Sequence, residues 1–161
     1  MPKVIVNSTP LIVLSNINQL ELLKKLYNEI YIPQAVFDEV TSKNDSACAQ
    51  LAQCPDWIHI CKIQHESERR MYQAKLHAGE VEVMILAQET PKADLVVLDD
   101  NAAKKTAKFL GLKVTGTLGV ILKAKKQGFI ERVMPLVEQM LDNGFYVTPE
   151  IQKMVREEAG E

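Results

Sequence analysis

The chain has 161 residues, of which 47% are hydrophobic and 25% are charged. This composition is ordinary for a globular protein, and the length predicts one domain over residues 1–161 with a sizeable core. The net charge of -2 excludes a global attraction to nucleic acid, so such a contact would need a local basic patch. Two lysine clusters are candidates, although each is also typical of a solvated helix face: Lys104, Lys105 and Lys108, and Lys123, Lys125 and Lys126.

The cysteine spacing and the hydropathy pattern predict the cellular compartment of the protein. Cys48, Cys54 and Cys61 are odd in number and lack the close pairing of a zinc or redox motif, which predicts reduced thiols. The apolar run at residues 4–6 is too short for a signal peptide, and no stretch reaches the length of a membrane span. We therefore expect a soluble cytoplasmic protein without membrane contact.

The first half of the chain begins with a short apolar strand over residues 4–6. Polar residues and Pro10 then form a helix-start signal, which predicts a helix over residues 11–17. The next elements predicted are a helix over 20–27, a strand over 29–32, a helix over 33–40 and a helix with loose ends within 42–56.

The second half begins with an alternating edge strand over residues 57–63. Residues 95–98 are apolar without alternation, as in a parallel strand buried on both faces. The other predicted elements are helices over 67–76, 80–89, 101–110, 120–126, 129–141 and 149–158, and a strand over 113–115, with Gly111 in a left-handed conformation. Strands that alternate with helices predict a helix-rich α/β fold, a three-layer α/β/α arrangement around a short central parallel sheet.

Two carboxylates, Asp99 and Asp100, directly follow the predicted buried strand. Ligands of open α/β sheets bind at the carboxyl ends of the strands, so the pair indicates a cation site. The alternative is that one of the two acids only caps the helix that follows, which Asp does well, and this run by itself favours capping.

Three further acids fall near the same edge. Glu39 projects from the apolar stripe of its helix, where an exposed acid is the alternative. Glu80 and Glu82 begin another helix, and their spacing of two lets at most one of them face a given site. The helix dipole also favours acids in a first turn, which is the structural explanation of both.

A cluster of Glu39, Glu80, Asp99 and Asp100 would offer the oxygen ligands that Mg²⁺ or Mn²⁺ prefers. Such ions suit phosphodiester hydrolysis, because they activate water and stabilise the leaving oxygen. The three histidines have no ligand spacing, and residues 116–119 lack the Gly-Lys-Ser/Thr ending of a Walker A loop. Ser8 and Thr9 lack the setting of a nucleophile elbow.

Five segments occur together in an order that resembles the PIN-domain family, the fold of VapC-type toxin ribonucleases. They are residues 4–12 (VIVNSTPLI), 32–40 (IPQAVFDEV), 79–82 (GEVE), 98–100 (LDD) and 114–119 (VTGTLG). The resemblance covers almost the whole chain. It implies a metal-dependent nuclease whose acids are Glu39, Glu80 and one of the Asp99-Asp100 pair, with Ser8 or Thr9 as the small hydroxyl after the first acid.

One position departs from the family pattern, since Asn7 stands where the family usually has Asp. An amide oxygen can coordinate a metal or orient its water but carries no charge, so metal affinity should fall about 10- to 100-fold. Asn7 is compatible with lost activity, with an engineered change or with a tolerated variant.

Two hypotheses follow. The chain is an endoribonuclease acting on single-stranded RNA as the toxin of a toxin–antitoxin pair, with Lys104 or Lys123 on the phosphates, a small antitoxin partner and a homodimeric state. Alternatively, it is a catalytically silent PIN-fold module that binds RNA or protein. A phosphoacceptor signalling domain is disfavoured, because it needs an acid pair where the chain has Asn7-Ser8.

Overall fold

The computed structural model describes residues 3–53, 55–91 and 93–161. Its centre is a five-stranded sheet in the order β3-β2-β1-β4-β5, and every neighbouring pair is parallel. The strands are β1 (Lys3–Val6), β2 (Ile30–Pro33), β3 (Ile58–Cys61), β4 (Ala93–Val97) and β5 (Lys113–Thr115). The predicted α/β fold with a parallel sheet is confirmed, and β3 is the predicted edge strand.

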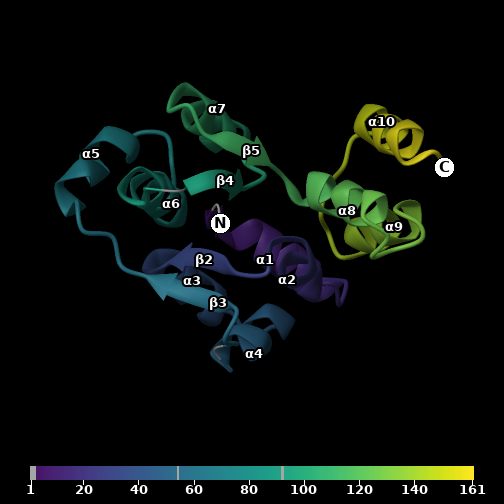
Figure 1. The fold of residues 1–161 in the computed structure, drawn as a ribbon, viewed down its shortest axis with the longest axis horizontal. Coiled ribbons are helices and arrows are strands. Elements are labelled where there is room, and N and C mark those ends of the chain that lie inside the picture. The colour runs from purple at the N-terminus through teal and green to yellow at the C-terminus, as the bar shows by residue number, and fades with distance from the viewer. Residues whose placement is uncertain (1–2, 54, 92) are drawn as a thin grey trace.

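Helices join the strands and cover the sheet in a three-layer arrangement (Figure 1). Their bounds are α1 (Ser8–Asn16), α2 (Glu21–Tyr27), α3 (Gln34–Thr41), α4 (Ser46–Ala52), η1 (Glu66–Glu68), α5 (Arg69–Tyr72), α6 (Ala78–Glu89), α7 (Asn101–Phe109), α8 (Thr117–Lys126), α9 (Met134–Asp142) and α10 (Pro149–Ala159). Among them α6 packs against β1, β2 and β4. Its residues from Gly79 to Ala87 are all buried, so α6 is a core helix and not an amphipathic one.

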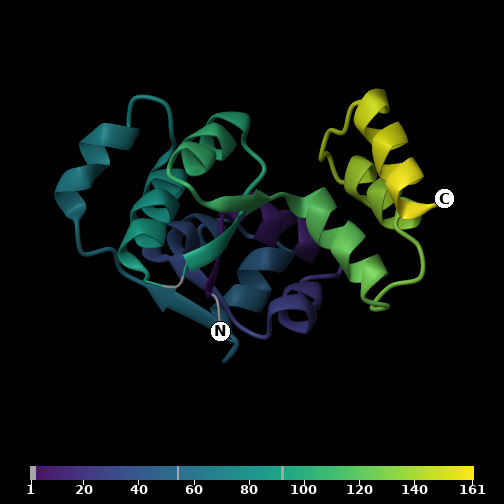
Figure 2. The same ribbon diagram turned by 45° about the horizontal axis from the view of Figure 1, so that its top comes forward.

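Three helices form a group at one end of the molecule. Figures 1 and 2 show α8, α9 and α10 together there, with α5 at the opposite end beyond α6. The Glu161 carboxylate accepts the backbone N–H groups of Val133 (2.7 Å) and Met134 (3.1 Å) and the ammonium of Lys125 (2.9 Å). The Val133 hydrogen bond, with these other donors, lowers the Glu161 pKa to about 2. This carboxylate therefore joins α10 to the beginning of α9.

Four predicted helices are wrong in extent, and the one predicted over residues 11–17 begins at Ser8. Over residues 67–76 the structure has only the short η1 and α5, because the segment buries only Tyr72 and Leu76 and then turns into α6. The helix predicted over residues 129–141 begins at Met134, where Pro135 lies in the first turn and fixes the start. The helix predicted over 120–126 begins three residues earlier, at Thr117, for a reason found at the site below.

Other predictions can be compared directly. Gly111 has φ +81°, the left-handed conformation expected of it. Cys48 and Cys61 are free thiols, whereas Cys54 lies outside the described residues, as do Met1 and Pro2. Within the described ranges, no helix is long and apolar enough to span a bilayer.

Candidate active site at the carboxyl edge of the sheet

The strand order places a topological switch point between β1 and β4. The chain leaves β1 towards β2 on one side and leaves β4 towards β5 on the other. In open α/β sheets, ligands bind in the crevice at such a point, beyond the carboxyl ends of the two strands. Asn7 follows β1, and its backbone N–H donates to the Val97 carbonyl at 2.9 Å. Asn7 and the Asp99-Asp100 pair therefore flank the place where ligands of parallel sheets bind.

Asn7 is buried, with 4% of its surface exposed. Its side chain makes no capping hydrogen bond to α1, and its Oδ1 lies 3.5 Å from the Ser8 hydroxyl. The beginning of α6 packs directly on this corner. A Cβ atom added at Gly79 would lie 3.5 Å from Ser8 Oγ and 3.6 Å from Asn7 Oδ1. These are ordinary van der Waals distances, so the beginning of α6 lies against Asn7 and Ser8 and brings the next residue, Glu80, to the same corner.

Glu80 is the buried acid of the site, with 8% of its surface exposed. One carboxylate oxygen accepts the His77 N–H at 2.9 Å, a cap of α6. Burial raises the pKa of Glu80, and the negative charges of Asp100 and Glu39 raise it further against the opposing effect of the His77 hydrogen bond. Three predicted site residues, one each from α6, the end of β4 and α3, therefore affect one another electrostatically.

Glu39 stands at the open side of this group. It lies on α3 with an exposed side chain, while its neighbour Asp38 accepts a hydrogen bond from Gln34 at 2.9 Å. Among the described residues no hydrogen bond or ion pair involves the Glu39 carboxylate. The negative charge of Glu39 raises the pKa of Glu80. Because no described residue pairs with its carboxylate, Glu39 is available to bind a ligand that enters from solvent.

The two carboxylates of the Asp99-Asp100 pair differ in their contacts. Asp100 caps α7, accepting the Ala103 N–H on Oδ2 at 2.9 Å, and its other oxygen has no described partner. Asp99 has both oxygens engaged by Thr117, which donates its N–H to Oδ1 (2.9 Å) and its hydroxyl to Oδ2 (2.7 Å). The predicted capping of the next helix therefore applies to Asp100, whereas Asp99 binds the first residue of α8, and only Asp100 keeps an oxygen without a described partner.

The contact between Asp99 and Thr117 also explains where α8 begins. Thr117 is fully buried and is the first residue of α8. A Cβ atom at Gly116 would lie 2.7 Å from Asp99 Oδ1 and 3.2 Å from Lys104 Nζ, so only glycine leaves room there. Residues 114–119 match a family segment, but the sequence alone predicts no role for Thr117 within it. A Thr at a helix start, with an acid ending the neighbouring strand, was the available signal.

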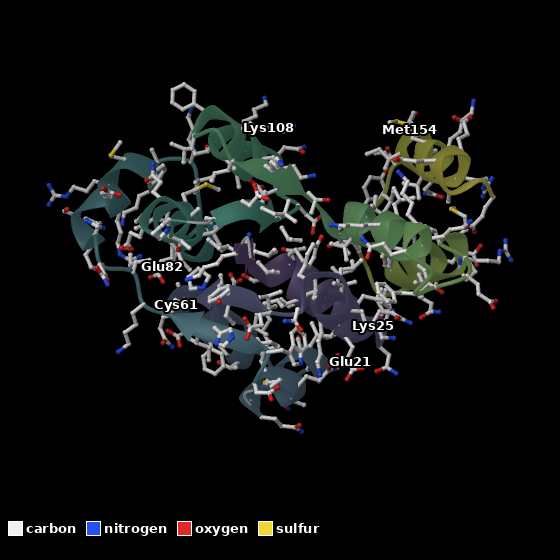
Figure 3. All side chains as sticks on the ribbon, in the orientation of Figure 1. Glu21, Lys25, Cys61, Glu82, Lys108 and Met154 are labelled. Atoms are coloured by element: carbon white, nitrogen blue, oxygen red, sulfur yellow. The ribbon has the colours of Figure 1, made fainter. Side chains whose placement is uncertain are left out.

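Glu82 does not share the crevice with Glu80. One of its oxygens accepts the Ala35 N–H at 3.0 Å at the start of α3, and the other pairs with Arg69. Figure 3 shows Glu82 beside α6, well away from Lys108 on α7. Its two oxygens are both engaged, so Glu82 fixes the beginning of the helix that carries Glu39. Of Glu80 and Glu82, Glu80 is the one whose charge interacts with Asp100 and Glu39.

Lys104 lies beside the Asp99 end of the candidate site. Its ammonium lies at the backbone of Gly116, as does the Asp99 carboxylate, one turn along α7 from Asp100. Its contact with an RNA phosphate stays a prediction. Lys123, the other candidate, instead lies over the ring of Tyr27, 4.8 Å from its centroid.

The donor set fits a hard divalent cation. Glu39, Glu80 and Asp100 offer carboxylate oxygens, Asn7 offers an amide oxygen, and no basic side chain pairs with Glu80 in the described part of the chain. In the described ranges no three acidic, histidine or cysteine side chains are already close enough to hold an ion. The side chains would therefore have to draw together around the ion. The metal ligands stay a prediction.

Comparison with known proteins identifies the family of the chain. A family model described as a PIN domain matches residues 3–161, and a search of curated proteins found no match. PIN domains have a nuclease fold and generally depend on divalent metal ions. The match covers nearly the entire chain, and the parallel sheet has the architecture that the family implies. The chain therefore belongs to the PIN-domain family.

Proposed function

We propose that the chain is a metal-dependent endoribonuclease that hydrolyses phosphodiester bonds in RNA. The observation that carries this proposal is the buried Glu80, whose pKa is raised by its burial and by the carboxylates of Asp100 and Glu39. Like charges held together in a protein are costly unless a cation compensates them. If Glu80 only capped α6, the presence of the Asp100 and Glu39 carboxylates near it would have no explanation.

Each residue of the site has an expected part in the reaction. A bound Mg²⁺ or Mn²⁺ would supply the positive charge that activates water and stabilises the leaving oxygen. Glu39, Glu80 and Asp100 would hold the ion, with Asp99 orienting the Gly116-Thr117 turn beside them. Asn7 would orient the site through its amide oxygen without adding charge. Lys104 would contact a phosphate of the RNA, which positions the strand without reading its sequence.

An RNA cleavage assay tests this proposal. The chain and its Asn7→Asp variant are incubated with single-stranded RNA and Mn²⁺, and Glu80→Gln in the Asn7→Asp background is the control. Cleavage by Asn7→Asp that is lost in the double variant supports the site. If Asn7→Asp neither cleaves RNA nor binds Mn²⁺ while circular dichroism shows an intact fold, the nuclease proposal is wrong.

Asn7 itself favours a second candidate, a silent module that binds RNA or protein through the same fold. The amide removes one negative charge from the corner where β1, β4 and α6 meet. In the same assay this candidate predicts that the chain with Asn7 binds RNA but leaves it intact, whereas Asn7→Asp cleaves it. Cleavage by both proteins excludes the silent module.

The biological setting is proposed on the family resemblance alone. The chain would act in the cytoplasm as the toxin of a toxin–antitoxin pair and form a homodimer. Co-expression with the product of a small neighbouring reading frame should relieve growth inhibition by the active form, and light scattering should give twice the chain mass of 18.1 kDa. Growth inhibition that no neighbouring product relieves, or a monomeric mass, contradicts the corresponding part.

A further inference from the structure

Helix α7 carries a line of positive charge that leads away from the candidate site. Between Asn101 and Phe109 it has three lysines and no acid, although the whole chain has a net charge of -2. Lys104 lies at the Gly116 backbone beside Asp99. Lys108 is four residues further along and shares its face of the helix. Figure 3 shows Lys108 on the outer side of α7.

An exposed aromatic ring lies at the far end of this line. Phe109 is the last residue of α7 and is 90% exposed, the highest value among the large hydrophobic residues described. It borders a groove of about 310 Å³ between α7 and the segment that includes α5. The other wall carries Met71, which is 75% exposed, and the lining contains no acid. We name this space the Phe109 groove; its lining residues are Met71, Tyr72, Ala74, Lys75, Leu76, Thr106, Phe109 and Leu110.

We propose that the Phe109 groove binds an unpaired base of single-stranded RNA, stacked on the ring of Phe109, while the lysines of α7 contact the phosphates between that base and the candidate site. Base–aromatic stacking combined with a cationic track is the general mode of single-strand binding. The nine residues of α7 span about 13 Å, a length that corresponds to roughly four stacked nucleotides. The inference rests on the proposed ribonuclease function, because it takes RNA as the substrate.

The charge pattern favours RNA over an acidic protein segment as the occupant. An acidic amphipathic helix could also cover Met71 and Phe109, with its acids on Lys75 and Lys105. Binding of such a helix would not explain why the lysines of α7 extend beyond the groove to the Gly116 turn beside Asp99. A strand of regularly spaced phosphates whose scissile bond lies at the acids accounts for both ends of the line.

Fluorescence anisotropy with a fluorescein-labelled 12-nucleotide oligouridine tests the proposal. The full chain is titrated in EDTA and 50 mM salt, so that binding is measured without cleavage. Phe109→Ala and Phe109→Leu should each weaken binding about tenfold, whereas Phe109→Trp should retain it, because stacking needs an aromatic face. Tyr146→Ala is the matched control, since Tyr146 is an aromatic residue on another part of the surface and is 78% exposed.

The salt dependence gives an independent readout. Lys108→Ala should lower the slope of log K against log salt by about 0.7, the value for one lost phosphate contact on a single strand. Lys153→Ala, on the exposed side of α10, should leave the slope unchanged.

The outcomes separate this inference from the proposed function. Equal binding by the chain and Phe109→Ala, or full binding by Phe109→Leu, overturns the groove proposal and leaves the nuclease proposal standing. No RNA binding by the chain or by Asn7→Asp overturns both. If Phe109→Ala binds RNA normally but loses a synthetic helical peptide with one leucine face and one glutamate face, the groove is a protein-docking surface and the inference is wrong.

Discussion

The Asp99-Asp100 pair allows the structural and functional roles of two adjacent carboxylates to be separated. Asp99→Ala removes the acceptor of the Thr117 N–H and of the Thr117 hydroxyl, and Thr117 is fully buried. The lost helix-start contact and the unsatisfied hydroxyl together should cost about 2–3 kcal/mol. In a chain of this size the melting temperature should fall by about 5–10 °C.

Asp100→Ala removes one capping hydrogen bond, from Ala103, at the beginning of α7. Its cost should be about 1 kcal/mol, less than half that of Asp99→Ala. Asp100→Asn keeps a good capping residue but removes the charge, so it should retain stability and lose most of the stabilisation that Mn²⁺ gives the Asn7→Asp background. These results would identify Asp100 as the functional member of the pair and Asp99 as the structural one.

Thermal unfolding followed by circular dichroism, with and without Mn²⁺, measures both effects. Asp142→Ala, at the exposed end of α9, is the control and should change stability by less than about 0.5 kcal/mol. Equal or greater destabilisation by Asp100→Ala than by Asp99→Ala would refute this assignment. So would an undiminished Mn²⁺ effect in Asp100→Asn.

Three further predictions concern charge. The fold raises the pKa of Glu80 above its usual value of 4.5, so the ionised form destabilises the folded protein and stability falls as the pH rises through the raised pKa. At pH 7 the Glu80→Gln variant should therefore be more stable than the unchanged chain. This difference, measured in urea titrations, should vanish below pH 4.5. An unchanged difference across this range contradicts the assignment. Because the pKa of Glu161 is lowered from 4.5 to about 2, its stabilising effect should be complete above pH 4.5 and disappear as pH falls through about 2; Glu161→Gln should abolish this acid-side loss, and an identical profile would count against it. Arg69→Ala leaves the buried Glu82 without its cation and should destabilise the fold at neutral pH by about 3 kcal/mol, whereas exposed Arg70→Ala should not; equal melting curves for the two contradict this.

The elements that could be predicted from the sequence are those whose pattern is local. An unbroken apolar run identified β4, and polar residues followed by proline indicated α1, although the helix begins at Ser8, three residues before its predicted start. The start of α8 could not be predicted, because it depends on Asp99, which is 18 residues away from Thr117 in the chain. The segment over residues 67–76 has helix-forming residues throughout, but only Tyr72 and Leu76 have a core to pack against.

In the candidate site, too, some features could be predicted from the local sequence and others depend on contacts between distant residues. Residue types and order were sufficient to nominate Glu39, Glu80 and the Asp99-Asp100 pair. The sequence could not choose between Glu80 and Glu82 or within the aspartate pair, since the choice depends on partners that the fold brings together: Ala35 and Arg69 for Glu82, and Thr117 for Asp99. The Phe109 groove also could not be predicted from the sequence, because the residues of its two walls are separated in the chain by α6 and β4.

The central claim is that Asn7, Glu39, Glu80 and Asp100 surround one divalent cation. Anomalous diffraction from crystals of the Asn7→Asp variant soaked in Mn²⁺ tests it most directly. We expect one strong peak at the switch point between β1 and β4, about 2.0–2.6 Å from oxygens of Glu80 and Asp100. A peak bound instead by Glu82 or Glu89, or the absence of any peak beside Glu80 at saturating Mn²⁺, would contradict it.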